Sequence, residues 1–272
     1  MIGKQVLRRF PRLNATYRAY RASRHLLRPP VQTPHGFWLA GDEAMQSGNF
    51  EPVETQLFQR LILDVDVLVN IGANVGYYCC LALAQQKHVI AFEPIPSNLE
   101  RLMLNMQLNG WQDSIEIFSM ALSSRIGIAE IYGSGTGASL IRGWAGQSDK
   151  PLLVPMSTVD NVLGERLQGR KCLVLVDIEG AEWQMLQGAT KLLHHSPKPV
   201  WMVEISVNEH QPAGTVINPN LLQTFQLFAD AGYCAETAEE VPRSVSLDEV
   251  RRVAHTRNET LGTHNFIFRS PT

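Results

Sequence analysis

The chain has 272 residues, of which 44% are hydrophobic and 18% are charged. This composition allows a substantial core and fits one large domain with extensions better than two full domains. It argues against a membrane-spanning protein, because the apolar runs break well short of the roughly 20 residues that a spanning helix needs. We expect no secretory signal, and we expect reduced thiols in a cytoplasmic protein, because the four cysteines form no CxxC pair.

The first 30 residues differ in charge from the rest of the chain. They hold 8 of the 24 basic residues, and no acid precedes Asp42, so the remainder carries 16 basic against 26 acidic residues. We expect a solvated or domain-packing basic helix, and the alternative is peripheral contact of residues 1–30 with an anionic membrane. A mitochondrial targeting peptide ranks third, because Pro11 interrupts the helix. We therefore predict a basic N-terminal extension and linker over residues 1–53 and a single domain over residues 54–272.

Helical and strand patterns alternate along this domain. The predicted helices cover residues 55–63, 75–86, 97–109, 182–193 and 219–231, with another beginning near Thr158. The predicted strands cover residues 66–71, 88–92, 115–118, 172–176, 200–205 and 266–268, with a short additional strand at 128–132. Ser97 is the expected N-cap and Gly110 the expected stop of one helix, and a Gly-rich loop at 133–146 is followed by a polar linker. This order predicts an α/β fold with a doubly wound, mostly parallel, seven-stranded sheet.

The turn after the first of these strands indicates a nucleotide-binding site. Gly72 and Gly76 let the backbone turn sharply and approach a ligand closely, and Glu93 ends the next strand. An acid at that place accepts hydrogen bonds from both hydroxyls of a ribose. The dinucleotide pattern GxGxxG is absent, and Asn74 crowds the place of a pyrophosphate. The pair therefore favours a nucleoside without phosphate groups, such as a methyl donor, over a nicotinamide.

Several segments together resemble the FkbM family of methyltransferases. They are residues 70–78, residues 91–94 with Asn98, and residues 176–182, where the sequence Val-Asp-Ile-Glu-Gly-Ala-Glu is the most specific part. Residues 120–123, 137–140, 154–162 and 265–268 also agree, so the resemblance covers roughly residues 54–205 and the final strand. It implies a class I, Rossmann-like methyltransferase that takes a methyl group from S-adenosylmethionine, typically to an oxygen of a sugar, lipid or natural product.

The resemblance also implies which residues bind the cofactor. These are Asn70, Gly72, Asn74, Gly76, Glu93, Pro94, Asn98, Ala121 and Asp177. One departs from the family, which usually has Asp where this chain has Asn70. Asn keeps a hydrogen-bonding amide and loses the charge that faces the cofactor's ammonium group, so we expect weakened rather than abolished binding.

Three carboxylates near the ends of two strands are the candidates for catalysis. Asp177, Glu179 and Glu204 are placed to act as general base for an acceptor hydroxyl. A divalent cation held by them is an alternative, but we predict no metal site. Glu182 is expected to stabilise a helix N-terminus, and His210 to lie in a surface loop.

The predicted function is O-methylation of a hydroxyl on a glycan, lipid or natural-product acceptor. The expected binding partner is therefore a small-molecule, glycan or lipid-linked acceptor. One alternative is an N-methyltransferase acting on a macromolecule, which the absence of an Asn-Pro-Pro-Tyr motif disfavours. Another is a non-catalytic protein whose cofactor pocket has decayed. We expect no nucleic-acid partner and a cytoplasmic, or else membrane-peripheral, location; the sequence predicts no oligomeric state.

Overall fold

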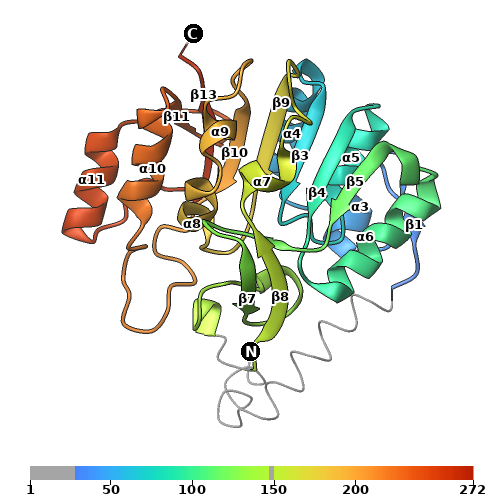
Figure 1. The fold of residues 1–272 in the computed structure, drawn as a ribbon, viewed down its shortest axis with the longest axis horizontal. Coiled ribbons are helices and arrows are strands. Elements are labelled where there is room, and N and C mark those ends of the chain that lie inside the picture. The colour runs from blue at the N-terminus through green and yellow to red at the C-terminus, as the bar shows by residue number, and fades with distance from the viewer. Residues whose placement is uncertain (1–27, 147–149, 272) are drawn as a thin grey trace.

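The computed structural model describes residues 28–146 and 150–271 (Figure 1). The basic segment predicted at residues 1–30, with its membrane alternative, therefore lies almost entirely outside the described residues. Within them, no helix is both long enough and apolar enough to cross a bilayer.

An eight-stranded sheet forms the centre of the molecule, in the order β12-β11-β13-β10-β9-β3-β4-β5. Its strands are β3 (Val67–Ile71), β4 (His88–Phe92), β5 (Ile115–Phe118), β9 (Cys172–Val176), β10 (Val200–Glu204), β11 (Cys234–Thr237), β12 (Ser244–Val245) and β13 (Asn265–Arg269). The five strands from β10 to β5 are parallel, and β13 is antiparallel to both of its neighbours. The predicted doubly wound α/β fold is confirmed, with seven strands of four or five residues and the two-residue β12 added at one edge.

Helices cover both faces of this sheet, and the alternation of side chains along each strand supplies both faces with apolar groups. One face carries α4 (Pro52–Leu61), α5 (Tyr77–Ala84) and α6 (Pro96–Asn109); the other carries α7 (Val159–Leu163), α8 (Glu182–Gln187), α9 (Thr190–Leu193), α10 (Leu221–Asp230) and α11 (Leu247–Thr256). In β3, for example, Leu68 packs with the first group, and Val67 and Val69 pack with the second. Burying each such side chain contributes about 1.5–3 kcal/mol.

The segment before residue 54 joins this core. It contains β1 (Val31–Gln32), β2 (Trp38–Leu39) and α3 (Glu43–Ser47), and the buried Phe37, Leu39 and Met45 pack in the same cluster as α4 to α6. The amide of Asn105 in α6 accepts a hydrogen bond from the backbone N–H of Ala40 and donates one to its carbonyl, at 2.7 and 3.2 Å. Packing of the domain thus begins ahead of residue 54.

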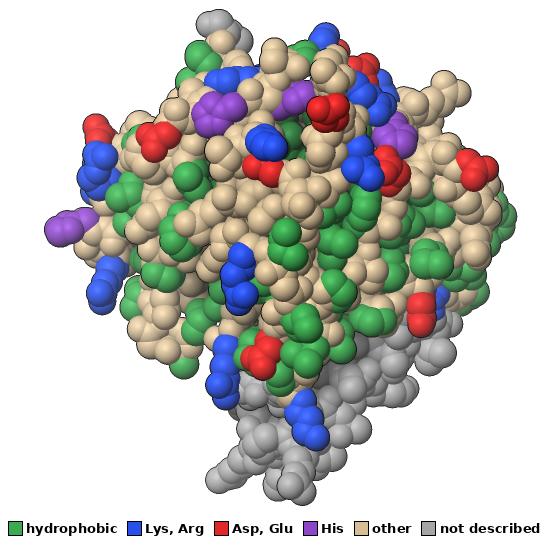
Figure 2. All heavy atoms as spheres, viewed as in Figure 1, with side chains coloured by type: hydrophobic (Ala, Val, Ile, Leu, Met, Phe, Trp, Pro, Cys, Tyr) green, Lys and Arg blue, Asp and Glu red, His purple; other side chains and the backbone are tan. Residues whose placement is uncertain are grey.

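A second, three-stranded sheet has the order β6-β8-β7, from β6 (Ala121–Leu122), β7 (Gly127–Ile131) and β8 (Leu152–Ser157). The strand predicted at 128–132 corresponds to β7 but lies outside the main sheet, and β8 occupies part of the predicted polar linker. Figure 2 shows that charged side chains gather toward the upper edge of this view, while its middle is mostly hydrophobic or uncharged. Ile128 and Leu153 in the small sheet are exposed, and so is Ile126 in the turn between β6 and β7.

Local geometry changes two of the predicted helices. The helix predicted at 97–109 begins at Pro96 with Ile95 as its N-cap, so Ser97 lies inside it; Gly110 ends it in the left-handed conformation, as expected. The helix predicted at 182–193 is two helices, α8 and α9, separated at Gly188. A Cβ atom on Gly188 would lie 2.2 Å from the carbonyl oxygen of Ser123, which explains why a glycine stands there. Short 3₁₀ helices complete the described elements, at Ile62–Asp64, Gln112–Ser114, Gly135–Gly137 and Trp144–Gly146.

Candidate functional site

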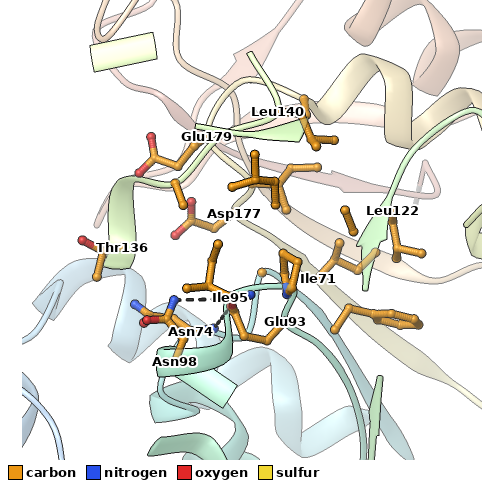
Figure 3. Close-up of a pocket in the computed structure, with 18 of the residues that line it drawn as sticks. Ile71, Asn74, Glu93, Ile95, Asn98, Leu122, Thr136, Leu140, Asp177 and Glu179 are labelled. Carbon is orange, nitrogen blue, oxygen red and sulfur yellow. Dashed lines mark hydrogen bonds between the residues drawn. The ribbon is translucent and has the colours of Figure 1, made fainter. Parts of the chain in front are cut away.

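Two cavities open at the carboxyl ends of the parallel strands. The first has about 610 Å³ of space, open solvent included, and lies between the ends of β3, β4 and β9 and the small sheet. Figure 3 shows Glu93, Asn74 and Asn98 on one side of this cavity, with Asp177 and Glu179 across from them. The second has about 530 Å³ and lies on the other side of the β3–α5 turn, toward α3, α4 and β10. The location agrees with the rule that open α/β sheets bind ligands beyond the carboxyl ends of their strands.

Glu93 is the anchor of the first cavity. Its carboxylate accepts hydrogen bonds from the backbone N–H groups of Asn74 (2.7 Å) and Ile95 (2.8 Å) and from the side-chain amide of Asn98 (3.3 Å). Glu93 is only 3% exposed, and this burial raises its pKa to about 7 although the three hydrogen bonds act in the opposite direction. The carboxylate is thus held rigidly at the wall of the cavity. The predicted residues Pro94, Asn98 and Ala121 line the same cavity.

The two predicted glycines of the turn do different things. Gly72 lines both cavities at φ +89°, and a Cβ there would lie 1.9 Å from the carbonyl oxygen of Asp177, so only glycine lets β3 and β9 end so close together. Gly76 lines neither cavity. It begins α5 in the left-handed conformation, and its Cβ would lie 2.3 Å from Leu102 in α6, so it serves the packing of two helices.

Asn70 lies on β3, between β4 and β9, and lines the second cavity. It is only 2% exposed. Its amide nitrogen donates to the sulfur of Cys79 at 3.4 Å, and its amide oxygen accepts no hydrogen bond from any residue that the structure describes. Asn74, at φ +52°, lines both cavities and presents its backbone N–H to Glu93.

Asp177 and Glu204 are two acids without a counter-charge. Asp177 follows β9 and lines both cavities, whereas Glu204 ends β10 and lines the second. Within the described ranges, neither carboxylate forms a hydrogen bond or an ion pair. Desolvation by the surrounding protein and the charges of nearby acids, Glu179 first, raise the pKa of Asp177 well above its usual value. The residue is nevertheless exposed to solvent in the cavity. Burial and the charge of Asp177 raise the pKa of Glu204 to about 10.

Glu179, the third predicted catalytic acid, is engaged with other segments. Its carboxylate accepts a hydrogen bond from the indole N–H of the buried Trp144 at 2.6 Å and lies 3.8 Å from the ring of His210. Its carbonyl accepts the hydroxyl of Ser139 at 2.6 Å. These contacts attach the Gly-rich loop to the turn after β9. Gly180 completes the fit, since a Cβ there would lie 2.4 Å from the Trp144 ring.

Glu182 is buried, and its carboxylate accepts the backbone N–H of Gly180 at 2.9 Å, at the start of α8. Burial raises its pKa to about 7. This arrangement agrees with the expected role at a helix N-terminus.

Sequence reasoning missed the acids of the second cavity that come from before the domain's first strand. Glu51 lines this cavity with a left-handed backbone, φ +39°, directly before Pro52, and accepts the hydroxyl of Tyr78 at 2.8 Å. Glu54 also lines it and accepts the side-chain amide of Asn265 at 3.1 Å. Nothing in the local sequence marked these residues; a non-glycine residue with positive φ is a feature that only the structure reveals. Among the described residues, no group of three or more His, Cys, Asp or Glu side chains is arranged to hold a metal ion.

Comparison with known proteins gives a family match over more than half of the chain. The model of the FkbM methyltransferase domain matches residues 70–234. No curated protein sequence matches.

Among solved structures, the chain is similar to a methyltransferase FkbM from Methylobacillus flagellatus KT, with 15% identity, a TM-score of 0.44 and coverage of 76% of this chain and 44% of that one. It is also similar to a SAM-dependent methyltransferase from Agrobacterium tumefaciens, with 11% identity, a TM-score of 0.44 and coverage of 90% and 70%. A precorrin-6y C5,15-methyltransferase from Geobacter metallireducens GS-15 gives 12% identity, a TM-score of 0.40 and coverage of 80% and 85%. The chain spans less than half of the length of the first of these.

Proposed function

Because the chain belongs to the FkbM family of S-adenosylmethionine-dependent methyltransferases, we propose that it methylates a hydroxyl oxygen of a glycan, lipid or natural-product acceptor. The observation that carries this proposal is the position of Asp177, whose unpaired carboxylate lies where the two cavities meet. The first cavity then takes the nucleoside and the second takes the acceptor.

The residues of the first cavity fit an adenosine. Glu93 presents a buried, rigidly held carboxylate that suits the two hydroxyls of a ribose. The apolar Ile95 and Leu122 offer walls for a base. The bound cofactor supplies a methyl group on a positively charged sulfonium. Among the described residues, no lysine or arginine lines the first cavity, which fits a nucleoside without phosphates.

The chain's own contribution to the reaction is alignment and acceptance of a proton. Methyl transfer depends on holding the acceptor oxygen in line with the methyl group, and a rigid cavity achieves this by removing translational and rotational freedom. Asp177 is the proposed base, because it borders both cavities and none of the described residues occupies its carboxylate. Glu204 is the second candidate. Glu179 is the weakest of the three, since Trp144 already donates to its carboxylate.

Calorimetric titration with S-adenosylmethionine and with its demethylated product, S-adenosylhomocysteine, tests the cofactor. Both should bind, and no binding at millimolar concentration would remove the proposed activity and favour a protein with a decayed pocket. Asp177→Asn tests the base: it should bind S-adenosylhomocysteine and lose most of its turnover, and full turnover would remove Asp177 from that role. Mass spectrometry of the product separates O- from N-methylation.

A further inference from the structure

The charged side chains that line the second cavity are all acids. Glu51, Glu54, Asp177 and Glu204 line it, and no lysine, arginine or histidine of the described residues does. Two of the cavity's donors are already committed to two of these acids: the hydroxyl of Tyr78 to Glu51 and the side-chain amide of Asn265 to Glu54. Asp177 and Glu204 retain all of their acceptor capacity. The cavity is therefore electronegative and lacks the internal cation that such a group of acids ordinarily pairs with.

Asn70 independently indicates that the cavity receives a hydrogen-bond donor. Asn70 is only 2% exposed and lines this cavity, and its amide oxygen, which solvent in the cavity reaches, has no partner in the described part of the chain. An N–H or O–H group from an occupant of the cavity would satisfy it, either the amino group of the cofactor or a group of the acceptor.

The electrostatics of this cavity point the same way. Burial and the charge of Asp177 raise the pKa of Glu204, burial and the charge of Glu179 raise that of Asp177, and the charge of Glu51 contributes to both. Burial also raises the pKa of Glu51 itself. A cation placed among these groups would return them to their ionised form and release protons to solvent. A phosphate group placed there would meet only like charge.

We propose that the methyl acceptor carries a protonated amine near the hydroxyl that is methylated, and that Glu204 and Glu51 bind this amine while Asp177 faces the hydroxyl. The inference rests on the proposed function and narrows its acceptor to amine-bearing hydroxyl compounds, such as amino sugars. An amine fits better than a metal ion, because no metal-binding group of three or more ligands is arranged among the described residues. Ammonium forms charge-assisted hydrogen bonds with separate carboxylates and needs no fixed coordination geometry.

Three sugars that share one ring provide the test: glucosamine, glucose and glucose 6-phosphate. Each is titrated by calorimetry into the full chain saturated with S-adenosylhomocysteine, so that the cofactor's amino group already occupies its own place. We expect glucosamine to bind at least tenfold more tightly than glucose and glucose 6-phosphate not to bind, with proton release that appears as a dependence of the heat on the buffer. Equal or weaker binding of glucosamine relative to glucose would overturn the proposal.

Variants locate the amine. Glu51→Gln and Glu204→Gln should each reduce glucosamine affinity by about tenfold or more and reduce glucose affinity less, so that the preference for the amine is lost, whereas Glu240→Gln, an exposed acid outside both cavities, should change neither. Glutamine at position 51 can still accept the hydroxyl of Tyr78, and unchanged binding of S-adenosylhomocysteine shows that each variant is folded. Undiminished glucosamine affinity in both cavity variants would refute the assignment. Binding of glucose 6-phosphate only when MgCl₂ is added would also refute it, in favour of a metal ion.

The two proposals fail in distinguishable ways. If S-adenosylhomocysteine does not bind, the proposed function fails. If it binds and the preference for the amine is absent, only the nature of the acceptor is wrong.

Discussion

The titration of Glu93 makes the sharpest prediction about the cofactor. Ribose hydroxyls donate to an ionised carboxylate, and burial raises the pKa of Glu93 to about 7. Only the protein with ionised Glu93 then binds the cofactor well. At pH 6 about ten of every eleven molecules have Glu93 protonated, so cofactor affinity should be about tenfold lower at pH 6 than at pH 8. Above pH 8 the dependence should flatten.

Glu93→Gln is the matched perturbation. One carboxylate oxygen becomes an NH₂ group that faces the backbone N–H of either Asn74 or Ile95, each now within 2.8 Å of the carboxylate. Leaving one such buried donor unpaired lowers the free energy of unfolding by about 1–3 kcal/mol, and loss of the charged acceptor for the ribose hydroxyls weakens cofactor binding by about tenfold. The variant should also lose the pH dependence, because glutamine does not titrate.

Calorimetric titration of S-adenosylhomocysteine at half-unit steps from pH 5.5 to 8.5 measures both effects. Protons that belong to the ligand itself affect wild type and variant alike, so the ratio of their affinities isolates Glu93. A ratio that stays constant across this range would refute the assignment.

The same group sets an opposite trend in stability. Its pKa is raised above the unfolded value of 4.5, so protonation favours the folded state. This stabilisation is complete below pH 4.5 and is lost as the pH rises through 7, by about 3 kcal/mol. Denaturant unfolding of the cofactor-free protein should therefore show wild type gaining on Glu93→Gln as the pH falls, while cofactor affinity declines; equal pH profiles would contradict this account.

Three other changes test the turn and the loop around the cofactor. Gly72→Ala forces a Cβ against the carbonyl of Asp177 and should lower the free energy of unfolding by about 3 kcal/mol or more; a denaturation midpoint equal to wild type would show that the strand ends are not rigid. Asn70→Asp should tighten S-adenosylmethionine binding by about tenfold, because a charged acceptor replaces the unpaired amide oxygen, and looser binding by calorimetry would contradict this. Trp144→Phe removes the hydrogen bond to Glu179, so the Gly-rich loop should loosen and cofactor binding should weaken by about tenfold. Equal rates of trypsin cleavage in the loop of the wild type and of the variant would contradict this explanation.

Features with short-range causes were predictable from the sequence. The residues of β3, directly before Gly72, are mostly apolar on both faces of the strand, because helices cover both sides of the sheet there. The residues on either side of this segment are ones that end a strand. The same holds for β4, whose end places Glu93 at the cavity. These two strands lie next to each other, so the relation between the turn and Glu93 needed no knowledge of the remaining topology.

Features that depend on distant contacts were not predictable. β8 was not predicted because Pro155 interrupts its apolar run, and it is a strand because Val154 and Met156 pack inward. α11 was also not predicted, although Ser246 caps it and Val250 and Val253 form a buried face. Glu51 reaches the second cavity only through a left-handed backbone and a tyrosine 27 residues away. Glu179 has the sequence position of a catalytic acid, but its partner Trp144 comes from a loop whose course the pattern does not specify.

The place of β13 in the sheet has a consequence for the order of assembly during synthesis. This strand inserts between β10 and β11, although some 60 residues separate it from β10 along the chain. Until it arrives, β10 has an open edge, and the face of Glu204 that pairs with Asn265 is uncovered. A nascent chain therefore holds the β3–α5 turn long before it holds a finished second cavity. Chaperones that shield unpaired strand edges would act on this protein in that interval.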